Sequence, residues 1–282
     1  MNNESFAQRV QQAQLTTQEK HIADKISRNL SRTAFLTGPQ LAKECEVSAS
    51  AITRFAQKLG YSGFPELKID LEELFRQTIT PYEMFKEFLA DSRSNSVWQE
   101  SIAQDLQNVM TLQSVLDENL LEQVITVIEK GKTIYLAAID ASDVAVRLLS
   151  FYFRVVLGKP HNNLIGHGLS MKVKLADIGP EDVFVAISYQ RIFREIRDAA
   201  LFAKDKGACT IAITDSQANA LATVCDFVLI APVTGATFGY SHVAPVAMVN
   251  IIVNSLASRN PEQCLKNLER LRGIWNTIPL FC

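Results

Sequence analysis

The 282-residue sequence lacks the features that would assign it to a disulfide-rich, zinc-binding or membrane class of protein. Its five cysteines form no C-x-x-C pair and lie scattered among apolar neighbours, which favours reduced thiols in the cytoplasm. No apolar run reaches the length of a transmembrane helix, and the first five residues lack the charged-then-apolar pattern of a signal peptide. We therefore expect a cytoplasmic protein without a metal site or a cofactor.

The sequence also has little net charge. Its 28 Lys/Arg and 30 Asp/Glu residues give a formal charge of −2, so the chain as a whole is not a basic nucleic-acid binder. The first 77 residues hold 10 Lys/Arg and 9 Asp/Glu, a difference of only +1. Because neutralised phosphates supply non-specific DNA affinity, any DNA binding has to come from a local surface. A hydrophobic fraction of 48% and this length leave room for two domains with substantial cores.

Residues 47–60 have the features of one short amphipathic helix. Ser48 is a suitable N-cap, and Gly60 follows the last periodic residue, where a left-handed conformation is favoured. Apolar residues at helical spacing form one face. The opposite face carries no acid and is made of Ser50, Thr53, Arg54, Gln57 and Lys58. Such a helix suits the DNA major groove, although an ordinary surface helix has the same pattern.

The segment before this helix favours the DNA interpretation. Thr37 can cap a helix that has Pro39 in its first turn, and Gln40 stands at the spacing of a capping box. Residues 45–47 then form a tight turn into Ser48, which predicts a helix-turn-helix unit whose second helix reads DNA. Further helices are expected at residues 16–30 and 62–77, the latter with an acidic outer face turned away from DNA.

Residues spread over the first 75 positions resemble the helix-turn-helix domain of the RpiR family of bacterial transcriptional regulators. The resemblance depends on Val47-Ser48, Arg54-Phe55, Lys58-Leu59-Gly60-Tyr61, Gly63-Phe64 and Leu67-Lys68. Glu46 stands where the family usually has glycine, so it has to accept an uncomfortable backbone conformation. Ala49-Ser50-Ala51 replaces the usual Glu-Ala-Thr, so the family's operator sequence cannot be transferred. Within this domain, Ser50, Thr53 and Arg54 are expected near base edges, and Ser48 and Lys58 near phosphates.

The second half of the chain alternates strands and helices. Buried strands are predicted at 132–139, 182–188, 209–214 and 227–230, with a shorter one near 159–164. Continuous apolar strands separated by helices indicate a three-layer α/β fold with a parallel sheet covered on both faces. In such sheets ligands bind beyond the carboxyl ends of the strands, here residues 140–142, 188–191 and 214–216.

Residues 120–260 resemble a sugar isomerase (SIS) domain, the effector domain of RpiR regulators. The resemblance depends on residues such as Ile187-Ser188, Arg194-Glu195, Gly207-Ala208 and Ile213-Thr214. In the family, a Gly-x-Gly-x-Ser loop and a Ser-x-Ser/Thr-Gly-x-Thr loop hold a sugar phosphate. The first loop here keeps only Ser142 and has Asp140 in place of glycine. In the second, Gln190, Arg191 and Phe193 replace a hydroxyl residue, the glycine and the threonine.

These departures change what the loops can bind. Losing glycine at 140 and 191 limits how closely the backbone approaches a phosphate, and Asp140 places a carboxylate there. Arg191 and Arg194 add guanidinium groups that can bind a carboxylate or phosphate, although a solvated helix start with internal ion pairs is the alternative. A modified pocket for a small polar or anionic effector and a degenerate pocket that serves dimerisation both remain open. The candidate effector residues are Asp140, Ser142, Ser188, Gln190, Arg191, Arg194, Thr214 and His242.

Four segments follow from this interpretation: a helix-turn-helix domain (1–77), a linker and connecting helix (78–118), the SIS domain (119–260) and a C-terminal helix and tail (261–282). Two functions compete. The first is a cytoplasmic regulator, such as a repressor, that binds double-stranded operator DNA as a homodimer or tetramer and responds to a small metabolite. The second is an SIS-fold sugar-phosphate isomerase or lyase. It needs a base such as Glu195 or His242, and no convincing acid–base pair is evident, so no residue is assigned as catalytic.

Overall fold

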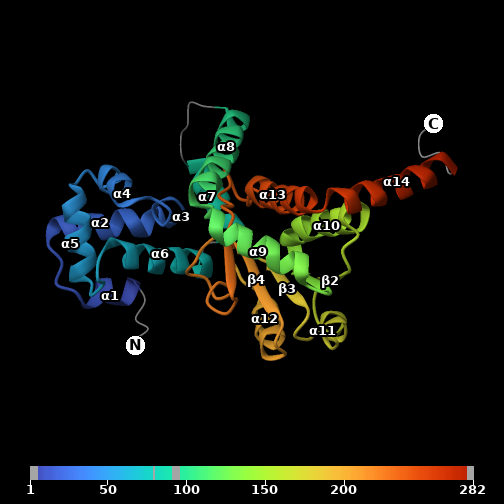
Figure 1. Cartoon of the computed structure of the whole chain (residues 1–282). Helices are drawn as coiled ribbons and strands as arrows, with labels where there is room; N and C mark the ends of the chain where they lie inside the picture. Colours follow the sequence, from blue (N-terminus) through green and yellow to red (C-terminus); the bar gives the residue numbers. More distant parts are fainter. Residues whose placement is uncertain (1–5, 79, 91–95, 278–282) are drawn as a thin grey trace. The chain divides into compact units, whose positions relative to one another are not determined.

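The computed structural model describes residues 6–78, 80–90 and 96–277 (Figure 1). It divides into two compact units, residues 1–94 with 237–239, and residues 95–236 with 240–282. Each unit has a hydrophobic core of its own. The four segment limits inferred from the sequence stay a prediction.

The first unit is helical. Its helices are α1 (Phe6–Gln12), α2 (Thr17–Arg28), α3 (Leu30–Thr33), α4 (Gly38–Glu44), α5 (Ala49–Lys58), α6 (Phe64–Thr78) and α7 (Pro81–Ala90). Ile22, Leu41 and Phe55 lie in a core that is closed to solvent. The helices predicted at 16–30 and 62–77, the short helix capped by Thr37 and the amphipathic helix within 47–60 are confirmed, whereas α1 and α7 were not predicted as helices.

The second unit is built on a five-stranded parallel sheet of order β2-β1-β3-β4-β5. Its strands are β1 (Ile134–Ala138), β2 (His161–Ile165), β3 (Val183–Ile187), β4 (Cys209–Thr214) and β5 (Phe227–Ile230). Ala137 of β1 pairs with Leu164 of β2 on one side and with Ala186 of β3 on the other. All five predicted strands are confirmed.

Successive side chains of each strand enter two different cores, as the period of two in a strand requires. Leu136 and Val185 pack on the layer of α9 (Glu118–Lys130), α10 (Asp143–Tyr152) and α13 (Val243–Arg259). Tyr135 and Phe184 pack on the layer of α11 (Leu169–Leu175) and α12 (Arg194–Asp205). The predicted three-layer α/β architecture is therefore confirmed (Figure 1). The unit also contains α8 (Val97–Val115), η1 (Asp140–Ser142), the π-helical turn η2 (Phe153–Leu157) and α14 (Pro261–Thr277).

Met171, Val173 and Leu175 alternate with lysines in the sequence, but only Met171 and Leu175 pack in the core. These residues lie on helix α11, where Met171 and Leu175 are one turn apart and buried. Val173 lies on the opposite face and is 62% exposed. Two buried residues four positions apart share one face of a helix. The alternation of apolar residues with lysines in the sequence resembles the pattern of a strand, so it does not indicate this helical face.

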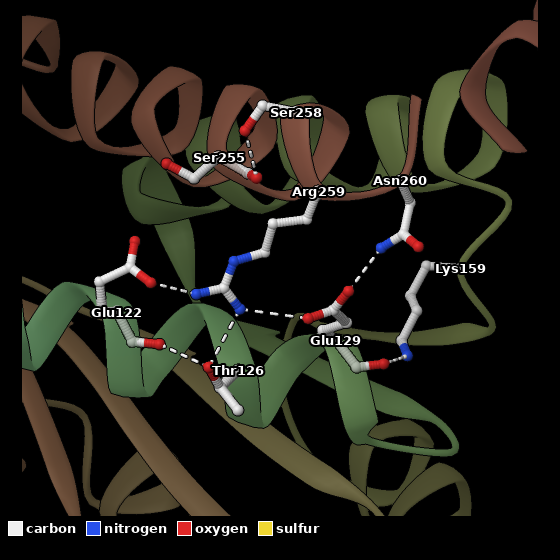
Figure 2. Close-up of polar contacts among 8 residues, drawn as sticks. All are labelled: Glu122, Thr126, Glu129, Lys159, Ser255, Ser258, Arg259 and Asn260. Atoms are coloured by element: carbon white, nitrogen blue, oxygen red, sulfur yellow. Dashed lines mark hydrogen bonds and ion pairs between the residues drawn. The ribbon is translucent and has the colours of Figure 1, made fainter. Parts of the chain in front are cut away.

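A polar network fixes α13 against α9 (Figure 2). At the end of α13, Arg259 donates to Thr126 Oγ1 at 3.0 Å and to Glu129 Oε2 at 3.1 Å, and it also pairs with Glu122. Lys159 donates to the Glu129 carbonyl at 2.7 Å, at the end of α9. These bonds hold the C-terminal end of α13 at several points along α9.

Candidate DNA-binding surface and effector site

Helices α4 and α5 are joined by a tight turn. The Val47 amide donates to the Ala42 carbonyl at 2.9 Å, which closes the turn, and Glu46 within it has φ 56°. A left-handed conformation is costly for a residue with a Cβ, which is the uncomfortable backbone expected for Glu46. α4 begins with a complete capping box, in which Thr37 Oγ1 accepts from Gln40 and the Gln40 side chain accepts from Thr37.

α5 divides into a buried face and an exposed face. Ile52 and Phe55 are fully buried, whereas Ser50, Thr53 and Arg54 are exposed. The exposed face carries no acid, as the sequence predicted. Ser48 caps the helix, because its Oγ accepts from the Ala51 amide at 3.2 Å. The arrangement offers hydroxyl, guanidinium and amide donors along one side of a helix that can enter a major groove.

Lys58, at the end of α5, is already in an ion pair. Its ammonium donates to Glu19 Oε2 at 2.7 Å, and the same carboxylate completes the capping box of Thr16 at the start of α2. Burial raises the pKa of the Glu19 carboxyl, but the hydrogen bonds from Lys58 and Thr16 outweigh it and hold that pKa below its ordinary value. A phosphate would therefore compete with Glu19 for Lys58, which the sequence did not indicate.

In the second unit, the strand order marks where a ligand is expected. The chain leaves β1 for α10 in one helix layer and leaves the neighbouring β3 for α12 in the other layer. Such a reversal is a topological switch point, and ligands of open α/β sheets bind in the crevice between the two diverging loops. The loops here begin at Asp140 and at Ser188.

Both loops contain a non-glycine residue in the left-handed region. Asp140 has φ 55° and Gln190 has φ 52°. The sequence indicated lost glycines at 140 and 191, but the strained residue of the second loop is Gln190 and not Arg191. The Gln190 amide donates to Asp215 Oδ1 at 2.9 Å, and this bond helps to hold the loop in its conformation. Strain held in place by surrounding bonds is typical of ligand-binding loops.

Three titratable side chains meet beside the first loop. His167 Nδ1 lies 3.0 Å from Glu195 Oε2, and His167 Nε2 lies 4.0 Å from Asp140 Oδ1. All three side chains are partly exposed, and the Phe193 ring packs edge-on to the imidazole with a centroid distance of 5.3 Å. His167 was not among the candidate residues. It lies two residues after β2, as Asp140 lies two residues after β1, and this position at the carboxyl end of a predicted strand could have identified it.

Other candidates are buried. Ser142, Ser188 and Gln190 have exposed fractions of 9% or less, and Thr214 is fully buried. The Thr214 hydroxyl accepts from Asn219, whose carbonyl accepts from two backbone amides, so these groups are used internally. Asn219 was not singled out in the sequence. The predicted effector contacts of these four residues stay predictions.

Charged and aromatic groups surround the second loop. Arg191 and Arg194 are exposed at the start of α12. Burial raises the pKa of Tyr240, with the charge of Arg191 acting against this and that of Asp215 adding to it, so both groups lie near this ring.

His242 is the N-cap residue of α13, and burial lowers the pKa of its imidazole. Its ring packs edge-on to Tyr189, with a centroid distance of 6.3 Å. Within the part of the chain that the structure describes, the Tyr189 hydroxyl and His242 Nδ1 are buried without a hydrogen-bond partner. Tyr189 was missed because an aromatic residue after a strand is usually core.

Two family models match the two units. A helix-turn-helix domain of the rpiR family matches residues 6–78, and an SIS domain matches residues 127–259. The uncharacterized HTH-type transcriptional regulator YfhH of Escherichia coli K12 is 30% identical over 214 residues, 73% of either chain. The chain belongs to the RpiR family. An uncharacterized HTH-type transcriptional regulator of Haemophilus influenzae is 26% identical over 224 residues, covering 77% of this chain and 75% of that one.

Solved structures agree with this RpiR fold. The sugar isomerase domain of an RpiR transcription factor from Sphaerobacter thermophilus superposes with a TM-score of 0.60 at 24% identity, covering 61% of this chain and 96% of that one. The Vibrio vulnificus NanR protein, complexed with ManNAc-6P, superposes with a TM-score of 0.59 at 18% identity, covering 95% and 96%. The protein is a helix-turn-helix transcriptional regulator with an SIS domain, a fold shared with isomerases. None of the described helices is long and apolar enough to cross a membrane.

Proposed function

We propose that this RpiR regulator binds a specific operator through α5, as a homodimer, and that a small anionic metabolite at the β1/β3 switch point controls its affinity for DNA. The exposed, acid-free face of α5 is the observation that carries the proposal. Thr53 and Arg54 lie on this face and approach base edges, while Ser48 and Lys58 lie nearer the phosphates. Because one short helix covers only a half-site, the operator is an inverted repeat read by two copies.

The loops at the switch point support an effector that combines hydroxyls with an anionic group. The carboxylates of Asp140 and Glu195 can accept hydrogen bonds from sugar hydroxyls. Arg191 and Arg194, at the positive end of α12, favour a phosphate or carboxylate. ManNAc-6P in the NanR complex belongs to this class of molecule. The carboxylate at Asp140 disfavours a phosphate close to the first loop, so the anionic group is assigned to the second loop.

A salt-titrated gel shift with the DNA upstream of the gene tests operator binding. The wild-type protein is expected to shift this DNA and not a scrambled fragment of the same length. Arg54→Ala is expected to weaken the specific complex by about 1–3 kcal/mol, the usual size of a lost base contact. Lys132→Ala, which removes an exposed cation from the second unit, is the matched control. No sequence-dependent shift, with or without ManNAc-6P, would contradict the proposal.

Calorimetry with ManNAc-6P and with inorganic phosphate tests the effector site. Arg194→Ala is expected to weaken ManNAc-6P binding, because a cation at the second loop is lost. Glu181→Gln, which precedes β3 at the amino end of the strands, is expected to bind like the wild type. If neither ManNAc-6P nor phosphate binds at millimolar concentration, a phosphate-binding effector site at the second loop is contradicted.

An aldose–ketose phosphate isomerase is the alternative activity on this fold. The pairing of His167 with Glu195 supplies an acid–base pair that the sequence did not reveal. Its exposure to solvent weighs against proton transfer chemistry, which usually takes place in an enclosed site. Turnover of a sugar phosphate by the wild-type protein, abolished in Glu195→Gln, would establish the isomerase.

A further inference from the structure

Helix α8 presents an apolar face with no charge to solvent. Trp98, Ile102, Leu106 and Met110 are between 53% and 64% exposed and follow one another at intervals of four residues. Residues at this spacing form one ridge along a helix, here about 18 Å long at 1.5 Å per residue. The only charged residues of α8 are Glu100 and Asp105, and both are half-buried, so no exposed residue of the helix is charged. We refer to these four apolar residues as the α8 ridge.

The opposite side of α8 is fixed to its own domain. Leu112 is buried in the core of the second unit. Asn108 donates to the Thr234 carbonyl at 2.8 Å, and Ser241 donates to Asp105 Oδ1 at 2.6 Å. These contacts hold the helix so that the α8 ridge is presented to solvent. An ordered helix with large apolar side chains on its exposed face indicates an interaction surface.

We propose that the α8 ridge is the contact by which α8 pairs with α8 of a second copy around a two-fold axis. A two-fold interface brings the same surface of both copies together. An exposed charge near the axis would therefore face the identical charge of the second copy and be repelled by it. The α8 ridge avoids this repulsion, because the other exposed residues of α8 are Gln, Ser, Ala and Val. An acidic or basic protein, or an anionic lipid surface, would find no charged group on this face to pair with. Charge-depleted centres with Trp and Met are typical of protein–protein interfaces.

This assignment rests on the proposed function in one respect: two copies are required to read an inverted-repeat operator. In chain order, α8 begins at Val97, three residues after the first unit ends at Ser94. Paired α8 helices would therefore tie together the two copies of the DNA-binding unit close to where each chain leaves it. The same helix is bonded to Ser241, next to His242 at the candidate effector site. One side of α8 thus forms the proposed dimer contact, and its other side is hydrogen-bonded to Ser241, beside the candidate effector residue His242.

Substitution of Leu106 tests the pairing. At micromolar concentration, analytical ultracentrifugation of the full chain is expected to give a dimer for the wild type and a monomer for Leu106→Glu, at least a tenfold weakening of association. Because Leu106 is exposed, the variant is expected to keep the wild-type circular dichroism. Mixing Leu106→Glu with Leu106→Lys is expected to restore a dimer, since opposite charges then meet near the two-fold axis. Val173→Glu, an equally exposed apolar position on α11, is the matched control and is expected to stay dimeric.

A monomeric wild type, or a Leu106→Glu variant that associates as strongly as the wild type, overturns the assignment. The outcome is separable from that of the proposed function. If the wild type dimerises through Leu106 but shifts no DNA, operator binding fails and the α8 contact stands. If Leu106→Glu stays dimeric and the protein still binds its operator, the α8 contact fails and the regulator stands.

Discussion

The ammonium of Lys58 lies 2.7 Å from the carboxylate of Glu19, so the last residue of α5 is joined to the first turn of α2. This ion pair occupies the cation expected to contact a DNA phosphate. Glu19→Gln removes the competing charge and keeps a residue that can complete the capping box of Thr16. We expect tighter operator binding and a slope of log K against log salt that is steeper by about 0.9, the value for one added phosphate contact.

Fluorescence anisotropy between 50 and 200 mM salt measures this slope. Lys58→Ala and the double variant Glu19→Gln/Lys58→Ala complete the cycle. The gain from Glu19→Gln is expected to vanish once Lys58 is absent. A gain that persists in the double variant would show that Glu19 acts through the general field of the domain and not through Lys58.

Glu46→Gly relieves a left-handed residue in the turn between α4 and α5. Glycine adopts φ near 56° without the Cβ clash that a glutamate has, although it loses more backbone entropy on folding. We expect a net stabilisation of about 0.5–1 kcal/mol in urea unfolding followed by the circular dichroism of the helices. Lys43→Gly, an exposed position inside α4, is the control and is expected to destabilise by about 1 kcal/mol.

Asn219→Ala removes the side chain that bonds Thr214 and two backbone amides in the loop after β4. The groups left behind are buried, and an unsatisfied buried polar group costs about 1–3 kcal/mol. The urea midpoint of the second unit is therefore expected to fall by a corresponding amount. Asn254→Ala, at an exposed position of α13, is expected to change stability by less than about 0.5 kcal/mol.

Asp226 gives a prediction for acid stability. Burial raises the pKa of its carboxyl, but hydrogen bonds from Lys204 and Thr210 outweigh this and lower the pKa in the folded protein. A lowered folded pKa contributes stability above the unfolded value of about 3.9, and this contribution is lost as the pH falls through the folded pKa. As the pH is lowered from 6 to 3, the melting temperature is expected to fall less steeply for Asp226→Asn than for the wild type. Identical slopes would contradict the role of this carboxylate, and Asp205→Asn is the exposed control.

The sequence predicted best what depends on local chemistry and on periodicity. The caps at Thr37 and Ser48, the strain at Glu46 and the five strands all follow from the side chains of a few neighbouring residues. The contacts that it did not predict join positions far apart in the chain. Lys58 meets Glu19 across 39 residues, and His167 meets Glu195 across 28. Neither pairing has a local pattern, because only the packing of helices and strands decides which exposed charges become neighbours.

Two hydrogen bonds lie on the inner side of α8, from Asn108 to Thr234 and from Ser241 to Asp105. Their free energy limits how far a metabolite that acts through them can change the affinity for the operator. A hydrogen bond contributes about 1 kcal/mol net, and 1.4 kcal/mol changes an equilibrium tenfold. If a metabolite acts only by breaking these two bonds, it can change the affinity for the operator by about thirtyfold at most. A larger induction ratio in the cell would require the metabolite to move the body of α13 as well, against the clamp that Arg259 forms at its far end.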